Sequence, residues 1–186
     1  FLNKTIEDLL AKAAGDIEIL AALDGYWPDP IIGDPRVTYI HRGAPRGMRA
    51  GIIACAAAAT GGYLLKLDAH CLLDQGFDEV LKADCDDDWV VVPRRKRLDA
   101  ENWCVQELGK PDIDYMYLSY PDDPGDFGGP GLNGKLWEER NADPELRKVL
   151  IDDLMSAQGS GWFMPRTYFD RLELMDEACY GTFWNE

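Results

Sequence analysis

Basic residues and histidines are scarce in this sequence. Its 186 residues include 19 lysines and arginines against 34 aspartates and glutamates, with two histidines and a net charge of −15. A chain this acidic lacks the basic face that nucleic acids and anionic membranes require, so we expect neither as a partner. A nucleotide ligand is compatible with this charge, because a divalent cation and one or two arginines neutralise a diphosphate locally.

Long apolar runs and paired cysteine motifs are also missing. No run approaches the ~20 apolar residues of a membrane-spanning helix, and no signal-peptide pattern is visible. The cysteines number five, and none belongs to a Cys-x-x-Cys motif. We therefore expect mostly buried thiols in a reducing compartment, and a cytoplasmic protein without a transmembrane segment.

The sequence does contain a regular alternation of strand and helix patterns. Its length and its hydrophobic content of 46% suit one domain with a sizeable core. The predicted strands cover residues 17–23, 37–40, 63–67, 89–93 and 115–120, and residues 158–164 are typical of a glycine-lined approach to another strand. The predicted helices cover residues 2–13, 48–60, 77–83 and 166–172, with a further helix opening at Asp143-Pro144 and a long loop at 121–134. This alternation indicates an α/β fold with a largely parallel sheet.

One stretch concentrates the candidate chemistry. The apolar strand 63–67 is followed directly by Asp68-Ala69-His70, and ligands bind at this edge of open α/β sheets. A carboxylate oxygen and an imidazole nitrogen at one strand end suit Mn²⁺, Mg²⁺ or Zn²⁺. A pattern this short also arises by chance in a solvated turn. The neighbouring Cys71 is a further candidate ligand, with core packing as its alternative role.

A second strand ends in an acidic group. Asp24-Gly25 follows the strand 17–23, and the carboxyl ends of parallel strands share one edge of the sheet. We therefore expect Asp24, Asp68 and His70 to lie around one crevice. The basic run at residues 94–97 is either a solvated turn or a surface that faces a phosphate.

Five segments, taken in order, carry a resemblance to a known family. They are Asp24-Gly25, residues 47–50 opening the alanine-rich helix, Leu67-Asp68-Ala69-His70, residues 159–164, and Trp184-Asn185-Glu186. Together they resemble the catalytic domain of glycosyltransferase family 2 and related nucleotide-sugar transferases of the GT-A fold, over nearly the whole chain. Most members have Asp-x-Asp at the metal motif, and Asp-x-His is similar to the variant of polypeptide N-acetylgalactosaminyltransferases.

The resemblance implies a fold and a role for each half of the chain. It implies an α/β, GT-A (Rossmann-like) fold whose mostly parallel central sheet is flanked by helices. Residues 1–186 would form a single domain, with a nucleotide-sugar-binding half at 1–100 and an acceptor-side half at 101–186. The family's first strand lies in the middle of the sheet, and this sequence starts at the helix that follows it. We therefore expect a fragment, or another segment in that place, with strands 17–23 and 63–67 not directly paired.

The resemblance also implies an activity. It implies a metal-dependent hexosyl- or N-acetylhexosaminyltransferase. The enzyme would move a sugar from a nucleotide-diphosphate sugar, with a UDP-sugar as the expected donor, to a hydroxyl of a saccharide, protein or lipid acceptor. Asp68 and His70 would hold Mn²⁺ or Mg²⁺, and Asp24, Arg49 and Asp68 would contact the donor. Enzymes with Asp-x-His take a further histidine downstream, whereas here the other histidine is His41, upstream in a loop.

The acceptor side is assigned by the same resemblance. Gly161, Trp162, Trp184 and Asn185 would line the sugar and acceptor pocket, and Glu186 would be the general base of an inverting reaction. Each residue also has an ordinary structural role: the tryptophans as core, and Glu186 as a solvated end. For Asp24 and Arg49 the alternatives are a turn residue and a surface arginine.

Two other functions compete with this interpretation. The first is a non-catalytic nucleotide- or carbohydrate-binding domain with a degenerate site, which the missing strand and the missing third ligand favour. The second is a sugar nucleotidyltransferase, which shares the sheet. That class uses a glycine-rich, arginine-containing loop after its first strand, and the sequence contains no such segment.

Overall fold

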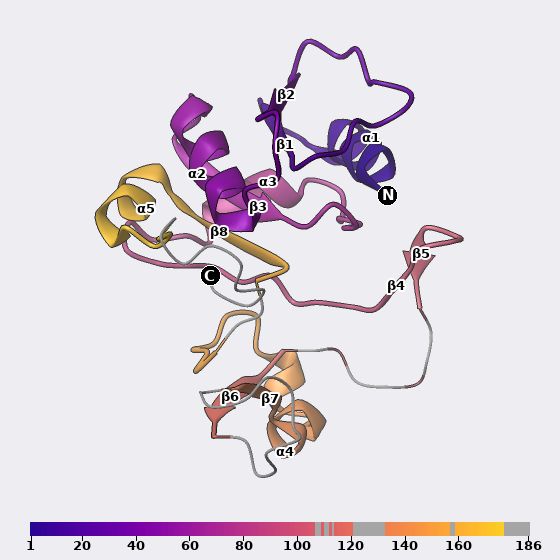
Figure 1. Cartoon of the computed structure of the whole chain (residues 1–186). Coiled ribbons are helices and arrows are strands. Elements are labelled where there is room, and N and C mark those ends of the chain that lie inside the picture. The colour runs from indigo at the N-terminus through magenta and orange to yellow at the C-terminus, as the bar shows by residue number, and fades with distance from the viewer. Residues whose placement is uncertain (107–108, 110–111, 113, 121–132, 157–158, 177–186) are drawn as a thin grey trace. The chain divides into compact units, whose positions relative to one another are not determined.

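The computed structural model describes residues 1–106, 109, 112, 114–120, 133–156 and 159–176 (Figure 1). Contacts divide the chain into two compact units, one formed by 1–91 with 160–186 and the other by 92–159. Each unit is described by itself. The single domain with halves at 1–100 and 101–186 stays a prediction.

The first unit contains most of the helices and strands expected from the sequence. Its elements are α1 (Leu2–Lys12), β1 (Ile19–Leu23), β2 (Val37–His41), α2 (Met48–Ala58), β3 (Tyr63–Leu67), α3 (Phe77–Ala83), β8 (Gly161–Pro165) and α5 (Arg166–Leu172). The predicted bounds of β3, α3 and α5 are those observed. The remaining bounds in this unit differ from the predicted ones by a few residues at most.

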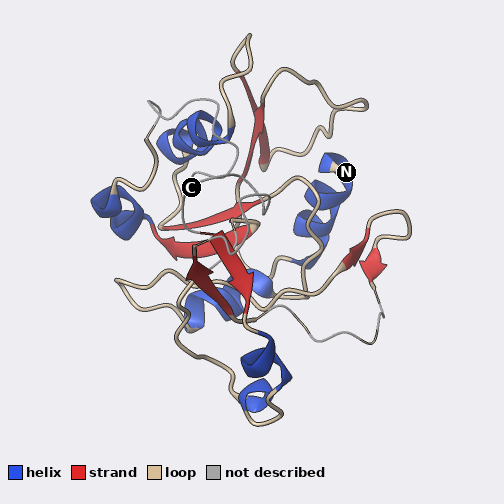
Figure 2. Cartoon of the chain, turned by 60° about the horizontal axis from the view of Figure 1, so that its bottom comes forward, coloured by secondary structure: helices blue, strands red, loops and turns tan. Residues whose placement is uncertain are grey.

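The strands of the first unit form two separate pairs (Figure 2). β1 and β2 run parallel, with Ile19 opposite Val37 and Leu23 opposite His41. β3 and β8 run antiparallel, in a register that sets Leu67 opposite Gly161. The expected parallel arrangement is thus present in β1–β2, whereas β3 takes an antiparallel neighbour. Within the described residues β1 and β3 are not paired with each other, as the sequence analysis expects.

Two helices pack on β1 for different reasons. In α1 the apolar residues recur at helical spacing, and Ile6, only 1% exposed, packs with Ile19 and Ala21 of β1. In α2 the residues are small, which lets the helix lie close to the strand. A Cβ built on Gly51 would lie 3.2 Å from the Cβ of Ala22, so the helix approaches as closely as a glycine allows.

The predicted strand at 89–93 is wrong in extent. The structure has a single antiparallel bridge there, in which the N–H of Val91 donates to the carbonyl of Phe163 and the carbonyl of Val91 accepts the N–H of Phe163, both at 2.8 Å. Pro93 follows two residues later and has no N–H with which to continue the ladder. The apolar run meets β8 only at Val91, and Trp89 and Val90 before it are exposed, so it does not extend as a strand.

The second unit is built from short elements. They are β4 (Leu98–Asp99), β5 (Cys104–Val105), β6 (Met116–Ser119), β7 (Asn133–Leu136), α4 (Glu138–Ala142) and the 3-10 helix η1 (Leu146–Lys148), with β4–β5 and β6–β7 antiparallel. Asn141 is 3% exposed, and its side chain accepts the N–H groups of Asp114 and Tyr115 and donates to the carbonyls of Tyr115 and Trp137. This one amide ties α4 to the start of β6.

The helix predicted to open at Asp143-Pro144 is also wrong. The chain has already made α4, which ends at Ala142, and the carboxylate of Asp143 accepts the N–H of Glu145 at 2.8 Å in a tight turn. Only one 3-10 turn, η1, follows. The Asp-Pro pair therefore marks a turn between two short helical segments, for which the same residues are equally suited.

Candidate functional site

A cavity of about 700 Å³ in the first unit runs along β1 and β3, from Asp16 and Gly61 at one end to Asp24 and Asp68 at the other. Its wall includes Asp24 and Asp68, the residues directly after the two strands, and apolar side chains of α1 and α2. At the other end of the strands the carboxylate of Glu18 accepts the N–H groups of Thr60 and Gly61. The two strands therefore begin at one edge, and the two carboxylates that the sequence analysis expects to converge line one cavity.

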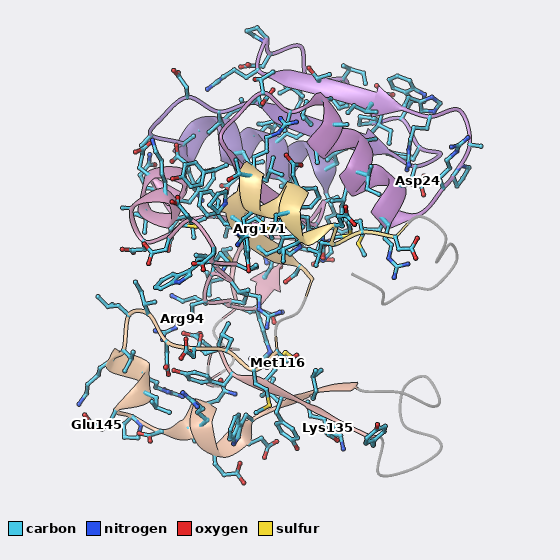
Figure 3. The ribbon with its side chains drawn as sticks, turned by 90° about the vertical axis from the view of Figure 1, so that its left-hand side faces the viewer. Asp24, Arg94, Met116, Lys135, Glu145 and Arg171 are labelled. Atoms are coloured by element: carbon cyan, nitrogen blue, oxygen red, sulfur yellow. The ribbon has the colours of Figure 1, made fainter. Side chains whose placement is uncertain are left out.

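Asp24 is held by the loop that leads into α2 (Figure 3). Its Oδ1 accepts Nη2 of Arg42 at 2.8 Å and the N–H of Arg46 at 2.7 Å, and its Oδ2 accepts the N–H of Gly47 at 2.9 Å. The hydrogen bond from Arg46, with those from Gly47 and Arg42, holds the pKa of Asp24 below its usual value. The side chain is still 35% exposed, so the carboxylate stays ionised and accessible at neutral pH.

Asp68 has a cation beside it already. Its Oδ1 accepts Nζ of Lys66 at 3.0 Å, and its backbone N–H donates to the carbonyl of Ser160 at 3.1 Å. The side chain of Lys66 is only 8% exposed, whereas that of Asp68 is 32% exposed. A cation arriving from solvent at Asp68 would therefore meet an ammonium that burial holds in place.

The turn after β3 is anchored to α1 by a buried threonine. Oγ1 of Thr5, a residue 3% exposed, donates to the carbonyl of Ala69 at 3.0 Å and accepts the N–H of Cys71 at 3.1 Å. The side chain of His70, between these two residues, is exposed. Burial raises the pKa of the Cys71 thiol, which suits the core role over a thiolate ligand.

Protein ligands for a metal are few here. Among the residues that the structure describes, no three histidine, cysteine, aspartate or glutamate side chains are grouped so that they could hold an ion. Of the two ligands that the sequence analysis expects, Asp68 lines the cavity, whereas His70 is not among the residues that line it. Mg²⁺ and similar ions are commonly held by one or two carboxylates together with substrate phosphates, so Asp68 suits an ion that also binds a diphosphate.

The other predicted site residues have varied surroundings. Arg49 lies in the first turn of α2, and its Nη1 donates to the carbonyl of Asp176 at 3.3 Å. Gly161 lies opposite Leu67 in the β3–β8 pair. Trp162 is 6% exposed and stacks on Phe169 of α5 with ring centroids 5.8 Å apart, and it belongs to the wall of the cavity. Trp184, Asn185 and Glu186 lie outside the described residues.

The basic run has structural partners in the second unit. Nε of Arg94 donates to Asp114 at 2.9 Å, and Nη2 of Arg95 lies 3.6 Å from the sulfur of Met116. Burial lowers the pKa of Arg95. Two of the four residues therefore serve packing and pairing within the unit.

Two residues of the first unit contribute to the site although sequence reasoning did not select them. Lys66 interrupts an otherwise apolar strand, and this interruption was the available signal. Arg42 comes directly after β2, where the sequence offers only a polar residue before a loop. It reaches Asp24 because β2 pairs in parallel with β1, which sets the ends of the two strands side by side.

Comparison with known families places this geometry in context. Residues 1–172 match the family described as Glycosyl transferase family 2. The match covers most of the chain, and the chain therefore belongs to this family. A search of curated proteins returned no match.

Family membership sets the general function. The chain is a glycosyltransferase domain of α/β, GT-A type, which transfers a sugar from a nucleotide-sugar donor to an acceptor. Within the part of the chain that the structure describes, no helix is long and apolar enough to cross a membrane.

Proposed function

We propose that this domain transfers a hexosyl or N-acetylhexosaminyl group from a UDP-sugar to an acceptor hydroxyl, with the help of Mn²⁺ or Mg²⁺. The observation that carries the proposal is the cavity that Asp24 and Asp68 line together. A nucleotide sugar needs an acceptor of hydrogen bonds for its nucleoside and a centre of positive charge for its diphosphate. One strand end offers a carboxylate, Asp24, that accepts hydrogen bonds. The other offers a carboxylate, Asp68, that would hold the divalent ion, and the ion would supply the positive charge.

Asp24 contacts the nucleoside in this proposal. Its lowered pKa keeps it ionised, and its exposed part can accept a hydrogen bond from a base or from a ribose hydroxyl. The bonds from Arg42, Arg46 and Gly47 fix the position of the carboxylate before any ligand arrives. A fixed acceptor loses little conformational entropy on binding.

Asp68 and His70 would hold the divalent ion. The ion would supply charge stabilisation for a leaving diphosphate. Lys66, paired with Asp68, adds a positive charge on the same side of the cavity. Arg49, at the first turn of α2, contributes a further cation toward the nucleotide.

The acceptor side rests on the segment that begins with β8. Gly161 and Trp162 contribute to the sugar and acceptor pocket in this proposal, and the resemblance assigns Trp184 and Asn185 to the same role. Glu186 removes the proton of the acceptor hydroxyl if the reaction inverts the anomeric centre. The acceptor is a saccharide, a protein or a lipid.

The test combines binding with turnover. Calorimetry measures the affinity for UDP with and without Mn²⁺, and a panel of nucleotide sugars is assayed for hydrolysis and transfer. Replacing Asp68 by Ala should weaken Mn²⁺-dependent UDP binding by roughly 10-fold or more and abolish turnover, whereas the exposed Asp74→Ala should change neither. UDP binding that is unaffected in Asp68→Ala would refute the assigned role of the strand end.

A second candidate is a non-catalytic nucleotide- or carbohydrate-binding domain. The Lys66–Asp68 pair favours it, because an ammonium already neutralises the carboxylate that would hold the ion. In that case UDP binds without Mn²⁺ and no nucleotide sugar is hydrolysed. The same calorimetric and turnover measurements separate the two functions.

A further inference from the structure

A short stretch of the second unit exposes apolar side chains to which the proposed function gives no role. Leu150 is 97% exposed, Met155 62% and Ile151 52%. Single apolar residues are common on protein surfaces, but a group of them on a soluble domain marks an interaction site. Segment 147–153, which begins in η1, contains Leu150 and Ile151 and is the part of this stretch that carries a pattern of charge.

Segment 147–153 is held in place near both of its ends. Oδ2 of Asp152 accepts the hydroxyl of Tyr115 at 2.8 Å and Nη2 of Arg140 at 2.7 Å. At the other end, Nε of Arg147 donates to the carbonyl of Asn141 at 3.2 Å. The polar side chains therefore tie the segment to its unit, while the apolar residues between them are exposed. A segment that is ordered before it binds loses less conformational entropy on binding.

The charges of this segment are arranged symmetrically about Leu150. Two cations, Arg147 and Lys148, precede three apolar residues, and two carboxylates, Asp152 and Asp153, follow them. A second copy turned by 180° about an axis through Leu150, perpendicular to the chain, sets each cation opposite a carboxylate and each apolar residue opposite an apolar one. Two-fold interfaces require such a surface, because the same patch of both copies meets and must be complementary to itself.

We propose that segment 147–153 is a contact surface for a second copy of this chain. The two segments run antiparallel, so that Leu150 meets Leu150 and Arg147 meets Asp153 at both ends. These residues are exposed and can reach a partner. Charges arranged in this way fix orientation and register more than affinity. Because a contact surface of this size is small, the dimer should be weak, with a dissociation constant on the order of 10 µM or above.

A lipid surface fits the same segment less well. Apolar residues beside two cations suit a membrane, but here Asp152 and Asp153 follow the apolar residues directly, and the chain carries a net charge of −15. Both features repel anionic headgroups. A second copy of the chain instead supplies a cation for each of these carboxylates.

The test measures self-association of the whole chain by sedimentation equilibrium, from about 10 to about 500 µM. At ~0.15 M salt the Debye length of ~8 Å screens the repulsion between two acidic chains, whereas opposite charges in contact still attract. Leu150→Ser should raise the dissociation constant of the dimer by roughly 10-fold or more, because both copies lose an apolar side chain. Leu174→Ser, at an exposed leucine of the first unit, should leave it unchanged.

A pair of charge reversals tests the antiparallel arrangement. Arg147→Glu sets two carboxylates opposite each other at both ends of the dimer, and Asp153→Arg sets two cations there. Each variant alone should therefore dimerise about 5-fold more weakly, or worse. An equimolar mixture of the two variants should regain the dimer, since each new charge then faces its opposite and the other Arg147–Asp153 pair is unaltered. Recovery on mixing would also show that both variants fold.

Three outcomes would overturn the inference. One is a chain that is still monomeric at about 500 µM, and vesicle binding that is lost in Leu150→Ser would then assign the segment to a lipid surface. Another is a dimer whose dissociation constant is the same in Leu150→Ser, which would place the contact elsewhere. The third is a mixture of the two charge-reversal variants that associates no better than either alone. The proposed function stands or falls separately, since segment 147–153 takes no part in the donor or acceptor sites proposed above.

Discussion

Lys66 and Asp68 lie two residues apart and form an ion pair, with Nζ of the lysine 3.0 Å from Oδ1 of the aspartate. The lysine side chain is 8% exposed and the aspartate side chain 32% exposed. An ion pair at this depth is neither fully screened nor fully desolvated. The interaction of Lys66 with Asp68 must weaken whenever a divalent cation binds the same carboxylate oxygen.

We therefore expect Lys66→Met to tighten Mn²⁺ binding. Methionine keeps the unbranched apolar stem in the strand and removes the competing ammonium, so the dissociation constant for Mn²⁺ alone should fall by about 1.5- to 5-fold, which corresponds to an ion pair worth about 0.2–1 kcal/mol. Calorimetric titration with Mn²⁺ measures the change. Lys82→Met, at an exposed lysine of α3, is the control. Unchanged or weaker Mn²⁺ binding in Lys66→Met would show that the two cations do not compete for Asp68.

Asp24 should contribute to stability in a pH-dependent way. Its pKa is lowered in the folded chain, first by the hydrogen bond from the N–H of Arg46, so the folded state favours the ionised form. That contribution is fully present above the unfolded pKa of about 3.9 and is lost as the pH falls through the lower, folded value. Because the side chain is 35% exposed, its size should not exceed about 1 kcal/mol.

The variant Asp24→Asn tests this expectation. Urea unfolding at pH 7 should show the variant less stable than the unaltered chain, and the difference should shrink between pH 5 and pH 3. Asp74→Asn, at an exposed aspartate, should show no such convergence. A stability difference that is constant across this range would mean that the charge of Asp24 is not what its neighbours stabilise.

Some parts of this fold could be predicted from local sequence and others could not. The apolar run that gives β3 and the spacing that gives α5 are complete in themselves, and both were predicted with the observed bounds. The run at 89–93 looks equally apolar, but a strand exists only where a neighbour pairs with it, and Val91 alone meets Phe163. The antiparallel order of β3 and β8 depends likewise on residues about 100 positions apart, which no local pattern contains.

The same reasoning applies to the site. Asp24 and Asp68 were predicted because an acidic residue directly after an apolar strand is a local signal with a known place in α/β sheets. The guanidinium of Arg42 reaches Asp24 through the parallel partner β2. This contact depends on strand pairing, and Arg42 itself gave no signal at a fixed spacing from Asp24.

Gly51 is the point of closest approach between α2 and β1. Because its Cβ position lies 3.2 Å from the Cβ of Ala22 and 3.6 Å from Nη2 of Arg42, a larger side chain must push the helix from the strand and disturb the arginine that binds Asp24. We expect Gly51→Val to lower the free energy of unfolding by about 1–3 kcal/mol, as overpacking does. Thermal unfolding provides the measurement.

Two further variants make the Gly51 experiment specific. Gly33→Val is the control, because a Cβ on Gly33 meets no atom within 4 Å. The double variant with Ala22→Gly should recover part of the loss, since it removes the atom with which the new side chain collides. If the effects of the two substitutions on the free energy of unfolding are additive, Gly51→Val destabilises the protein through helix propensity and not through this contact.

β1 and β3 are both walls of one cavity of about 700 Å³, and within the described residues each pairs on a single edge, β1 with β2 and β3 with β8. Strand edges and apolar side chains that face a space of this size favour an added strand, as the sequence analysis expects at this place. The start of α1 is tied to the carboxyl end of β3 through Thr5. A strand parallel to both neighbours would therefore finish where α1 begins.

This geometry predicts the effect of an added segment. A five- or six-residue strand of valine and isoleucine, joined ahead of Phe1 by a short glycine-serine linker, should occupy the cavity and raise the Tm by roughly 5–10 °C. Hydrogen exchange should slow in β1 and β3 together, because the new ladder would engage an edge of each. A matched extension with proline at alternate positions cannot donate these hydrogen bonds and should leave both measurements unchanged. Equal effects of the two extensions would mean that apolar mass alone, and not strand pairing, fills the space between β1 and β3.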